Sequence, residues 1–93
     1  MNYITPCLDM YTIYTKSGCP FCDKVKQLLN KEELDIIDCD RYIYENKEQF
    51  IDFIKCMTGG ITHKTFPIVF YKGDFIGGFT ETKTFYEKIY CKK

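Results

Sequence analysis

The first third of the chain changes from a strand pattern to a helix pattern within a few residues. Residues 10–15 are dense in β-branched and aromatic side chains, as strands are, and the pair Ser17-Gly18 ends that run. Apolar residues then recur at helical spacing from Pro20 to about residue 31, namely Phe21, Val25, Leu28 and Leu29. The pattern therefore predicts a strand that leads directly into a helix.

The middle of the chain repeats this alternation. Residues 34–39 hold two isoleucines between charged neighbours, which suits a short strand. Asn46 can cap a following helix, with Gln49 reaching back from three residues further on. The glycines at residues 59–60 should end that helix. Its predicted core-facing stripe consists of Phe50, Phe53, Ile54 and Met57.

The last third predicts a hairpin and a final helix. Residues 67–71 and 75–77 have the composition of two strands joined around Gly73-Asp74, a glycine-first pair typical of a tight turn. Thr80 can cap the helix, whose predicted apolar face is Phe85, Tyr86, Ile89 and Tyr90. At the other end, residues 1–9 show no clear period and are expected to form an irregular lead-in on the sheet edge.

The resulting order, β-α-β-α-β-β-α, predicts a single α/β domain over residues 1–93. A helical crossover between the first two strands implies a parallel pair, and the hairpin adds an antiparallel edge. We therefore expect a small mixed four-stranded sheet flanked by helices, with one hydrophobic core, which a chain of this length can form.

The charge balance argues against nucleic acid and membrane partners. Thirteen basic and 13 acidic side chains give a formal net charge of +0, so the chain has no strong field for polyanions. No apolar run approaches the roughly 20 residues of a membrane-spanning helix, and residues 1–9 lack the basic and apolar regions of a secretion signal. We expect a cytoplasmic protein whose partners are ordinary proteins or small molecules.

Two of the six cysteines, Cys19 and Cys22, lie where the first helix is predicted to start. The free N–H groups and positive dipole end of that helix would favour the thiolate of Cys19, which makes it the candidate nucleophile. Pro20 suits the first helical position, where its missing N–H costs nothing. One helical turn brings Cys22 beside Cys19 in a less exposed place, a geometry that suits a reversible disulfide.

Half of a structural zinc site is the alternative for this pair. Such a site needs about four ligands in paired clusters. The other candidate ligands are instead scattered singly along the chain: Cys7, Cys39, Cys56, Cys91 and His63. This scatter favours redox chemistry, and no bound metal is expected. The four remaining cysteines are expected to be small, buried or half-buried hydrophobes.

Three motifs in this order resemble those of the glutaredoxins. They are Cys19-Pro20-Phe21-Cys22 after the first strand, Thr65-Phe66-Pro67 at the start of the third, and Gly77-Gly78-Phe79-Thr80-Glu81 before the last helix. Each motif alone is weakly specific, but the three together are strong, and the resemblance runs from about residue 10 to residue 90. It implies a thioredoxin-like fold, glutathione as co-substrate, and a groove along the active-site helix that receives the tripeptide.

The resemblance also assigns roles to individual residues. Cys19 would be the attacking thiol and Cys22 the resolving one, while Lys16 would face a glutathione carboxylate. Pro67 would follow a cis peptide bond, with the preceding backbone pairing with the cysteinyl part of glutathione. Backbone N–H groups at the start of the last helix would receive the γ-glutamyl carboxylate. The implied glutathione-binding set is Lys16, Phe21, Thr65, Phe66, Pro67, Phe79, Thr80 and Glu81.

Three departures from the family pattern affect this assignment. Phe21 replaces the commoner tyrosine, which keeps an aromatic face without the hydroxyl. Glu81 replaces a usual aspartate, and its longer arm is expected to weaken the grip on the glutamyl amine. The loop of residues 58–64 is longer than in many relatives and has no evident glutamine, so His63 and Lys64 are the candidates for the second glycyl-carboxylate contact.

The predicted activity is glutathione-dependent reduction of protein disulfides and of protein–glutathione mixed disulfides, carried out by a monomer. One alternative is a carrier that holds an iron–sulfur cluster between two protomers through Cys19 and glutathione; Pro20 counts against it, because such relatives usually have a smaller residue there. Another is a hydrogen donor, for example to ribonucleotide reductase, fed by thioredoxin reductase. Lys16 and the Thr80-Glu81 pair favour glutathione over that route.

Overall fold

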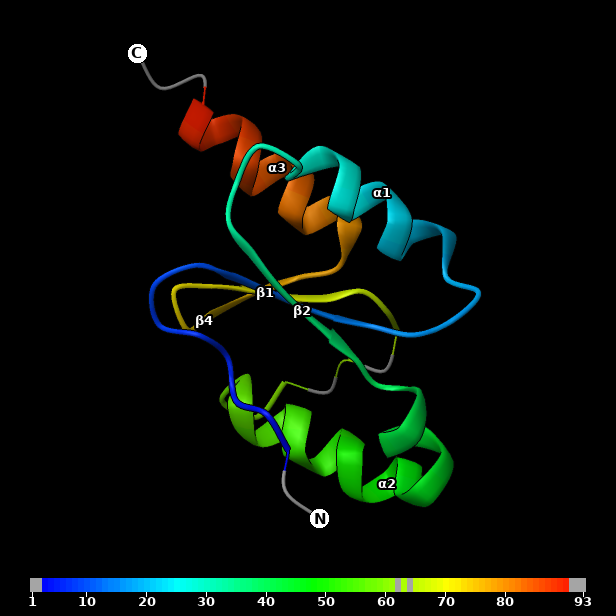
Figure 1. The fold of residues 1–93 in the computed structure, drawn as a ribbon. Coiled ribbons are helices and arrows are strands. Elements are labelled where there is room, and N and C mark those ends of the chain that lie inside the picture. Colours follow the sequence, from blue (N-terminus) through cyan, green and yellow to red (C-terminus); the bar gives the residue numbers. More distant parts are fainter. Residues whose placement is uncertain (1–2, 62, 64, 91–93) are drawn as a thin grey trace.

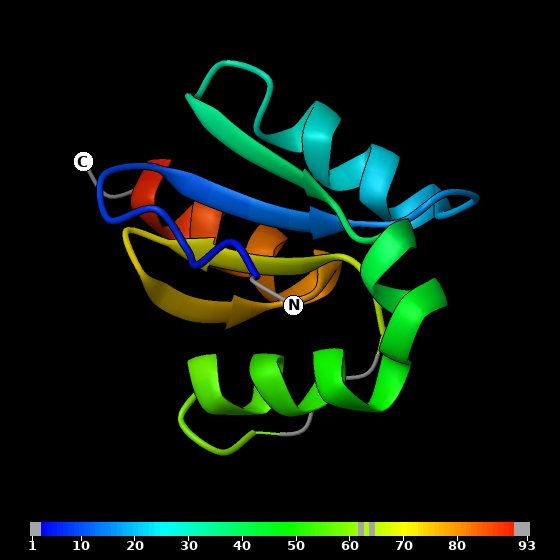
Figure 2. The same cartoon turned by 60° about the horizontal axis from the view of Figure 1, so that its bottom comes forward.

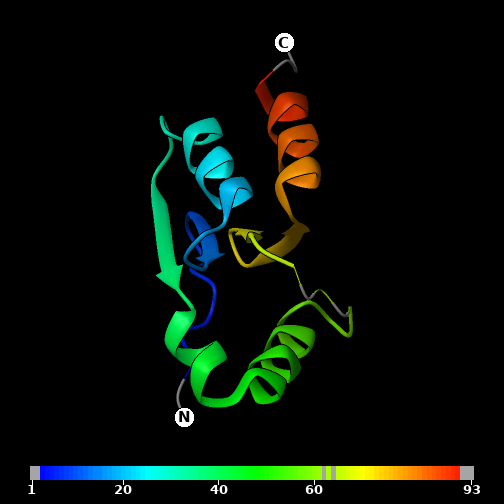
Figure 3. The same ribbon diagram turned by 90° about the vertical axis from the view of Figure 1, so that its right-hand side faces the viewer.

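The computed structural model describes residues 3–61, 63 and 65–90, which form a four-stranded sheet between two helical layers (Figure 1). The strands are β1 (Tyr11–Thr15), β2 (Leu34–Asp38), β3 (Ile68–Tyr71) and β4 (Asp74–Gly77). The helices are α1 (Pro20–Leu28), α2 (Asp40–Met57) and α3 (Phe79–Tyr90). Helices α1 and α3 cover one face of the sheet and α2 covers the other, as Figure 3 shows from the side. The predicted order of elements is confirmed.

The strand order in the sheet is β2-β1-β3-β4. β1 pairs with β2 in parallel, with Ile13 opposite Ile36, and β3 runs antiparallel to both β1 and β4. The predicted parallel first pair and antiparallel hairpin are therefore confirmed. All five residues of β1 are buried. The loop that carries Cys19 therefore starts from a strand that is packed in the core.

The apolar side chains divide between the two faces of the sheet. On the α2 face Tyr14 and Phe70 pack with Phe50 and Ile54, the fully buried residues of the predicted α2 stripe. Phe53 and Met57, which complete that stripe, are half-buried against the same cluster. The other face is filled by Tyr11, Ile13, Val25, Leu29, Val69 and Tyr86. Both layers of helices are thus fastened to the sheet by apolar burial.

Helix α2 starts earlier than the sequence pattern indicates. We expected it to begin at Asn46, but it begins at Asp40 and bends at Asn46, whose backbone is not helical (φ −163°, ψ 89°). The expected cap is present at the bend, because Asn46 Oδ1 accepts a hydrogen bond from the Gln49 N–H at 3.0 Å. The additional turns are stabilised by the Arg41–Glu45 ion pair and by Tyr42, which packs on the core.

The hairpin turn, the end of α1 and the core face of α3 also differ from expectation. The turn lies at Lys72-Gly73, both with positive φ (51° and 88°), and not at Gly73-Asp74, since Asp74 already pairs with Tyr71. Helix α1 ends at Leu28 rather than near residue 31. Ile89, expected on the core face of α3, is exposed, whereas Tyr86 of the same predicted face is buried.

The N-terminal segment crosses the face of the sheet (Figure 2), where Tyr3 contacts α2, and does not pack on the sheet edge where we expected it. The ring of Tyr3 stacks on Phe53 at 4.7 Å between centroids and meets Tyr42 edge-on at 4.9 Å. The backbone oxygen of Ile4 accepts a hydrogen bond from the Tyr14 hydroxyl at 2.7 Å. The aromatic side chain at position 3 therefore adds to the α2 core. No helix within the described ranges is long and apolar enough to cross a membrane.

Candidate active site

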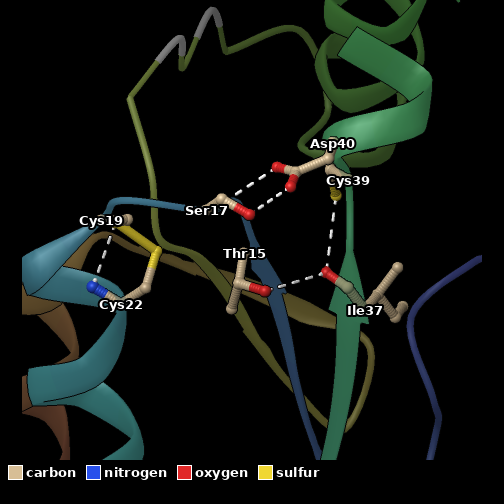
Figure 4. The surroundings of a disulfide bond; sticks show 7 residues. All are labelled: Thr15, Ser17, Cys19, Cys22, Ile37, Cys39 and Asp40. Atoms are coloured by element: carbon tan, nitrogen blue, oxygen red, sulfur yellow. Dashed lines mark hydrogen bonds between the residues drawn. A yellow bond between two sulfur atoms is a disulfide. The ribbon is translucent and has the colours of Figure 1, made fainter. Parts of the chain in front are cut away.

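Cys19 and Cys22 form a disulfide at the start of α1, with their Cα atoms 5.2 Å apart (Figure 4). Cys19 is the N-cap residue, and its Sγ accepts a hydrogen bond from the Cys22 N–H at 3.1 Å. Cys22 is 1% exposed, whereas Cys19 is half-buried and lines two surface grooves. Once the pair is reduced, this N–H and the helix dipole stabilise negative charge on Cys19, the sulfur that substrates can reach.

The local sequence explains how the chain turns into α1. Gly18 has φ +67°, a left-handed conformation that glycine adopts without strain. Pro20 occupies the first helical position, as expected. The carbonyl of Cys19 accepts hydrogen bonds from the N–H groups of Cys22 and Asp23, which closes the first turn. The chain therefore presents Cys19 at the N-terminus of α1, a few residues after the end of β1.

A groove of about 580 Å³ runs past Cys19. All predicted site residues except the buried Cys22 line it, and they come from three separate segments of the chain, residues 16–21, 65–67 and 79–81. The lining residues are Lys16, Gly18, Cys19, Pro20, Phe21, His63, Thr65, Phe66, Pro67, Gly78, Phe79, Thr80 and Glu81. The fold thus gathers the three sequence motifs around one groove, as the resemblance implied.

Aromatic side chains form much of the groove wall. The rings of Phe21 and Phe79 lie 5.9 Å apart, and Phe21 is 51% exposed. Phe66 stacks on the core residue Phe50 and lies 5.7 Å from the Lys16 ammonium, within cation–π range. The peptide bond between Phe66 and Pro67 is cis, which confirms the expectation for this position. The groove therefore combines a basic group with apolar faces.

The start of α3 is capped by Gly78 and not by Thr80, as we had expected. Gly78 O accepts the first helical hydrogen bond, from the Thr82 N–H at 3.0 Å, and the Gly78 N–H donates to Glu81 Oε1 at 2.9 Å. Glu81 thus supplies the carboxylate half of a capping box. Helix geometry leaves the N–H groups of residues 79–81 without intrahelical acceptors, so this end of the groove favours an anion.

His63 also lines the groove, beside this helix start. A Cβ on Gly78 would lie 3.8 Å from His63 Cε1, and the His63 ring meets Phe75 edge-on at 5.5 Å. Its Nε2 is a buried atom for which the described residues show no hydrogen-bond partner. Lys64, the other candidate for a glycyl-carboxylate contact, lies outside the described residues.

The remaining cysteines are unlike Cys19. Cys39 is fully buried, and burial raises the pKa of its thiol to about 12, so it is inert at neutral pH. Cys7 is half-buried, as expected, and its Sγ donates to Asp9 Oδ1 at 2.8 Å. Cys56 is exposed on α2, so the expectation that it is a buried hydrophobe was wrong. Cys91 lies outside the described residues.

Comparison with known proteins places this site in a family. The glutaredoxin family profile matches residues 11–76. Mitochondrial glutaredoxin-2 of Pongo abelii is 36% identical over 72 residues, which cover 75% of this chain and 42% of that protein. Glutaredoxin-1 of variola virus is 33% identical over 75 residues, covering 75% of this chain and 65% of the viral protein. The chain belongs to the glutaredoxin family.

Solved structures agree with this glutaredoxin assignment. The crystal structure of glutaredoxin 1 from Francisella tularensis, complexed with cacodylate, has a TM-score of 0.71 and 32% identity, and covers 87% of this chain and 95% of that one. The buckwheat glutaredoxin–glutathione complex has a TM-score of 0.64 at 22% identity, covering 91% of this chain and 72% of that one. The thioredoxin-like fold is therefore confirmed. The chain spans about half the length of the first curated relatives, 42% and 51%.

The tight approach of Gly77 to α3 gives a stability prediction for this glutaredoxin. Gly77 has φ +140°, and a Cβ there would lie 2.8 Å from Glu81 Cβ and Cγ. Gly77→Ala should therefore lower the free energy of unfolding by about 1–3 kcal/mol. Gly59→Ala is the matched control, because Gly59 has φ +80° but open space around it. If urea denaturation gives the same decrease in the free energy of unfolding for both variants, the close contact with Glu81 adds nothing to the cost of Gly77→Ala.

Proposed function

We propose that this glutaredoxin is a glutathione-dependent thiol-disulfide oxidoreductase that reduces protein disulfides and protein–glutathione mixed disulfides. The observation that carries the proposal is the groove, whose lining includes Cys19, the Lys16 side chain and the start of α3. Glutathione has one thiol between two terminal carboxylates, so a groove that offers a sulfur, a cation and a helix N-terminus suits it. The known complex of buckwheat glutaredoxin with glutathione supports the choice of tripeptide.

The first step transfers glutathione from a substrate protein to Cys19. The Cys19 thiolate attacks the glutathione sulfur of the mixed disulfide, a new S–S bond forms, and the old one breaks. The substrate protein leaves as a thiolate and takes a proton from water. The Cys22 N–H and the start of α1 hold the attacking sulfur ionised before the step.

The second step restores the enzyme. The thiolate of another glutathione attacks the glutathione sulfur on Cys19, which releases glutathione disulfide and the Cys19 thiolate. On a protein disulfide, Cys22 would instead attack the bond between Cys19 and the substrate and leave the disulfide seen in the structure. Glutaredoxin potentials of about −200 to −230 mV lie close enough to cytosolic glutathione for it to reduce that bond. We propose that the protein works in this way as a cytoplasmic monomer.

Lys16 gives a first test of the recognition model. Its ammonium is exposed, so we expect Lys16→Ala to raise the KM for glutathione about two- to fivefold, as exposed ion pairs do, with little change in kcat. The difference should shrink as salt is added, because screening weakens exposed charges. Lys47→Ala, at an exposed site on α2, is the matched control. A KM equal to that of the control at low salt would contradict the role of Lys16.

A trapping experiment tests the proposal itself. Cys22→Ser incubated with glutathione disulfide should gain one glutathionyl group, located on Cys19 by peptide mass mapping, and lose it when reduced glutathione is added. Cys56 is the internal reference, since it is exposed but lies away from the groove. Glutathionylation of Cys56 at a rate equal to that of Cys19 would contradict a built glutathione site.

A further inference from the structure

A carboxylate from outside the three motifs holds the loop in front of Cys19. Asp40, the first residue of α2, accepts two hydrogen bonds from Ser17, two residues before the nucleophile (Figure 4). The Ser17 N–H donates to Oδ1 at 2.8 Å, and the Ser17 hydroxyl donates to Oδ2. Both oxygens of one carboxylate are thus used on one loop residue, and we call this pair the Ser17–Asp40 latch.

The base of the latch is itself fixed. The Cys39 N–H donates to Thr15 O at 2.8 Å, and the Thr15 hydroxyl donates to Ile37 O at 3.4 Å. The Asp40 N–H donates to Asp38 Oδ1 at 3.0 Å. These bonds join the end of β2 to the end of β1, and the side chain of Cys39 between them is fully buried. The latch therefore restrains the loop against a rigid support.

The restrained loop carries Lys16 and Cys19, whose relative positions determine how the groove can bind glutathione. Lys16 and Cys19 lie on either side of Ser17 and Gly18, and both line the groove. Gly18 has wide conformational freedom, so an unlatched loop would have to be ordered at each binding event. The hydrogen bonds from Ser17, followed by the nearby charge of Lys16, lower the pKa of Asp40. The carboxylate that forms the latch is therefore ionised at neutral pH.

We propose that Asp40 is a positioning residue of the active site, which acts through Ser17 to hold Lys16 toward the glutathione carboxylate. This proposal rests on the proposed function, since it concerns how the same groove receives glutathione. Asp40 lies in none of the three motifs and does not line the groove that runs past the Phe66-Pro67 bond. Its role follows only from the contact between α2 and the loop.

Asp40→Asn tests the latch, because an amide of the same shape has one acceptor oxygen and no charge. We expect kcat/KM for a glutathionylated peptide to fall about two- to fivefold, no more than the loss expected for Lys16→Ala, because Asp40 acts through that side chain. The loss should appear mainly in KM. Asp52→Asn is the matched control, an exposed carboxylate on the same helix. Ser17→Ala keeps the backbone bond and should give a smaller loss of the same kind.

A double-mutant cycle separates positioning from a general loss of structure. If Asp40 acts by holding Lys16, Lys16→Ala should change KM less in the Asp40→Asn background than in the wild type. Additive effects, or an Asp40→Asn enzyme as active as Asp52→Asn, would overturn the proposal. Should Asp40→Asn fail to fold, a Ser17→Ala enzyme with wild-type KM would overturn it equally. If the wild type does not turn over the glutathionylated peptide, the proposed function fails, and this outcome is distinct from failure of the latch.

Discussion

Cys19→Ser should abolish the reduction of a glutathionylated peptide, whereas Cys22→Ser should retain it. The half-buried Cys19 is the sulfur on the groove, and no mixed disulfide can form there without it. Cys22 is 1% exposed and is needed only to resolve a bond to a protein substrate. We expect Cys22→Ser to keep its rate within a factor of about ten, a barrier change of less than ~1.4 kcal/mol. Release of the peptide thiol, followed by mass spectrometry, measures both variants.

The same two variants should differ on a protein disulfide. Cys22→Ser should stall there as a mixed disulfide between Cys19 and the substrate, because the resolving thiol is missing. Cys56→Ser, at an exposed site away from the groove, should behave as wild type on both substrates. Full activity of Cys19→Ser on the glutathionylated peptide would contradict the assigned nucleophile.

Phe50→Ala should strongly lower the free energy of unfolding, and it removes a core side chain that contacts the groove. Phe50 is 1% exposed, and its ring stacks on Tyr42 at 5.5 Å and on Phe66 of the groove at 6.2 Å. Truncating such a side chain costs about 3–5 kcal/mol, a large part of the 5–15 kcal/mol that stabilises an average domain. We expect Tm to fall by more than about 12 °C, measured by circular dichroism.

The control for Phe50 is on the same helix. Tyr44 is 89% exposed, so Tyr44→Ala should change the free energy of unfolding by no more than about 0.5 kcal/mol. If the Phe50→Ala and Tyr44→Ala proteins have the same Tm, the aromatic cluster around Phe50 does not stabilise the packing of α2 on the sheet.

The sequence was most informative where local chemistry and periodicity act together. The Cys19 turn was predictable because glycine adopts the positive φ of Gly18 without strain and proline suits the first helical position, which Pro20 occupies. The α2 stripe was predictable because Phe50 and Ile54 lie one helical turn apart. The three motifs predicted which segments line the groove, since all of them lie at segment ends that the sheet brings together.

What sequence reasoning missed depends on contacts between distant segments. The first turns of α2 contain the run Tyr42-Ile43-Tyr44, which has no helical spacing of its own, and packing of Tyr42 and Ile43 on the core stabilises these turns. Ser17 and Asp40 are 23 residues apart and belong to no shared pattern, so only the fold reveals their contact. The cap at Gly78 was missed because Thr80 is the stronger capping residue by type, whereas Glu81 satisfies the Gly78 N–H instead.

The most direct test of the account is turnover with a single source of electrons. The assay contains the wild-type protein, a glutathionylated peptide, glutathione, glutathione reductase and NADPH. NADPH should be consumed at a rate proportional to the concentration of the wild-type protein, and Cys19→Ser should show only the background rate. With thioredoxin reductase in place of glutathione and its reductase, turnover should stay at background. Turnover with thioredoxin reductase alone, and none with glutathione, would contradict glutathione dependence.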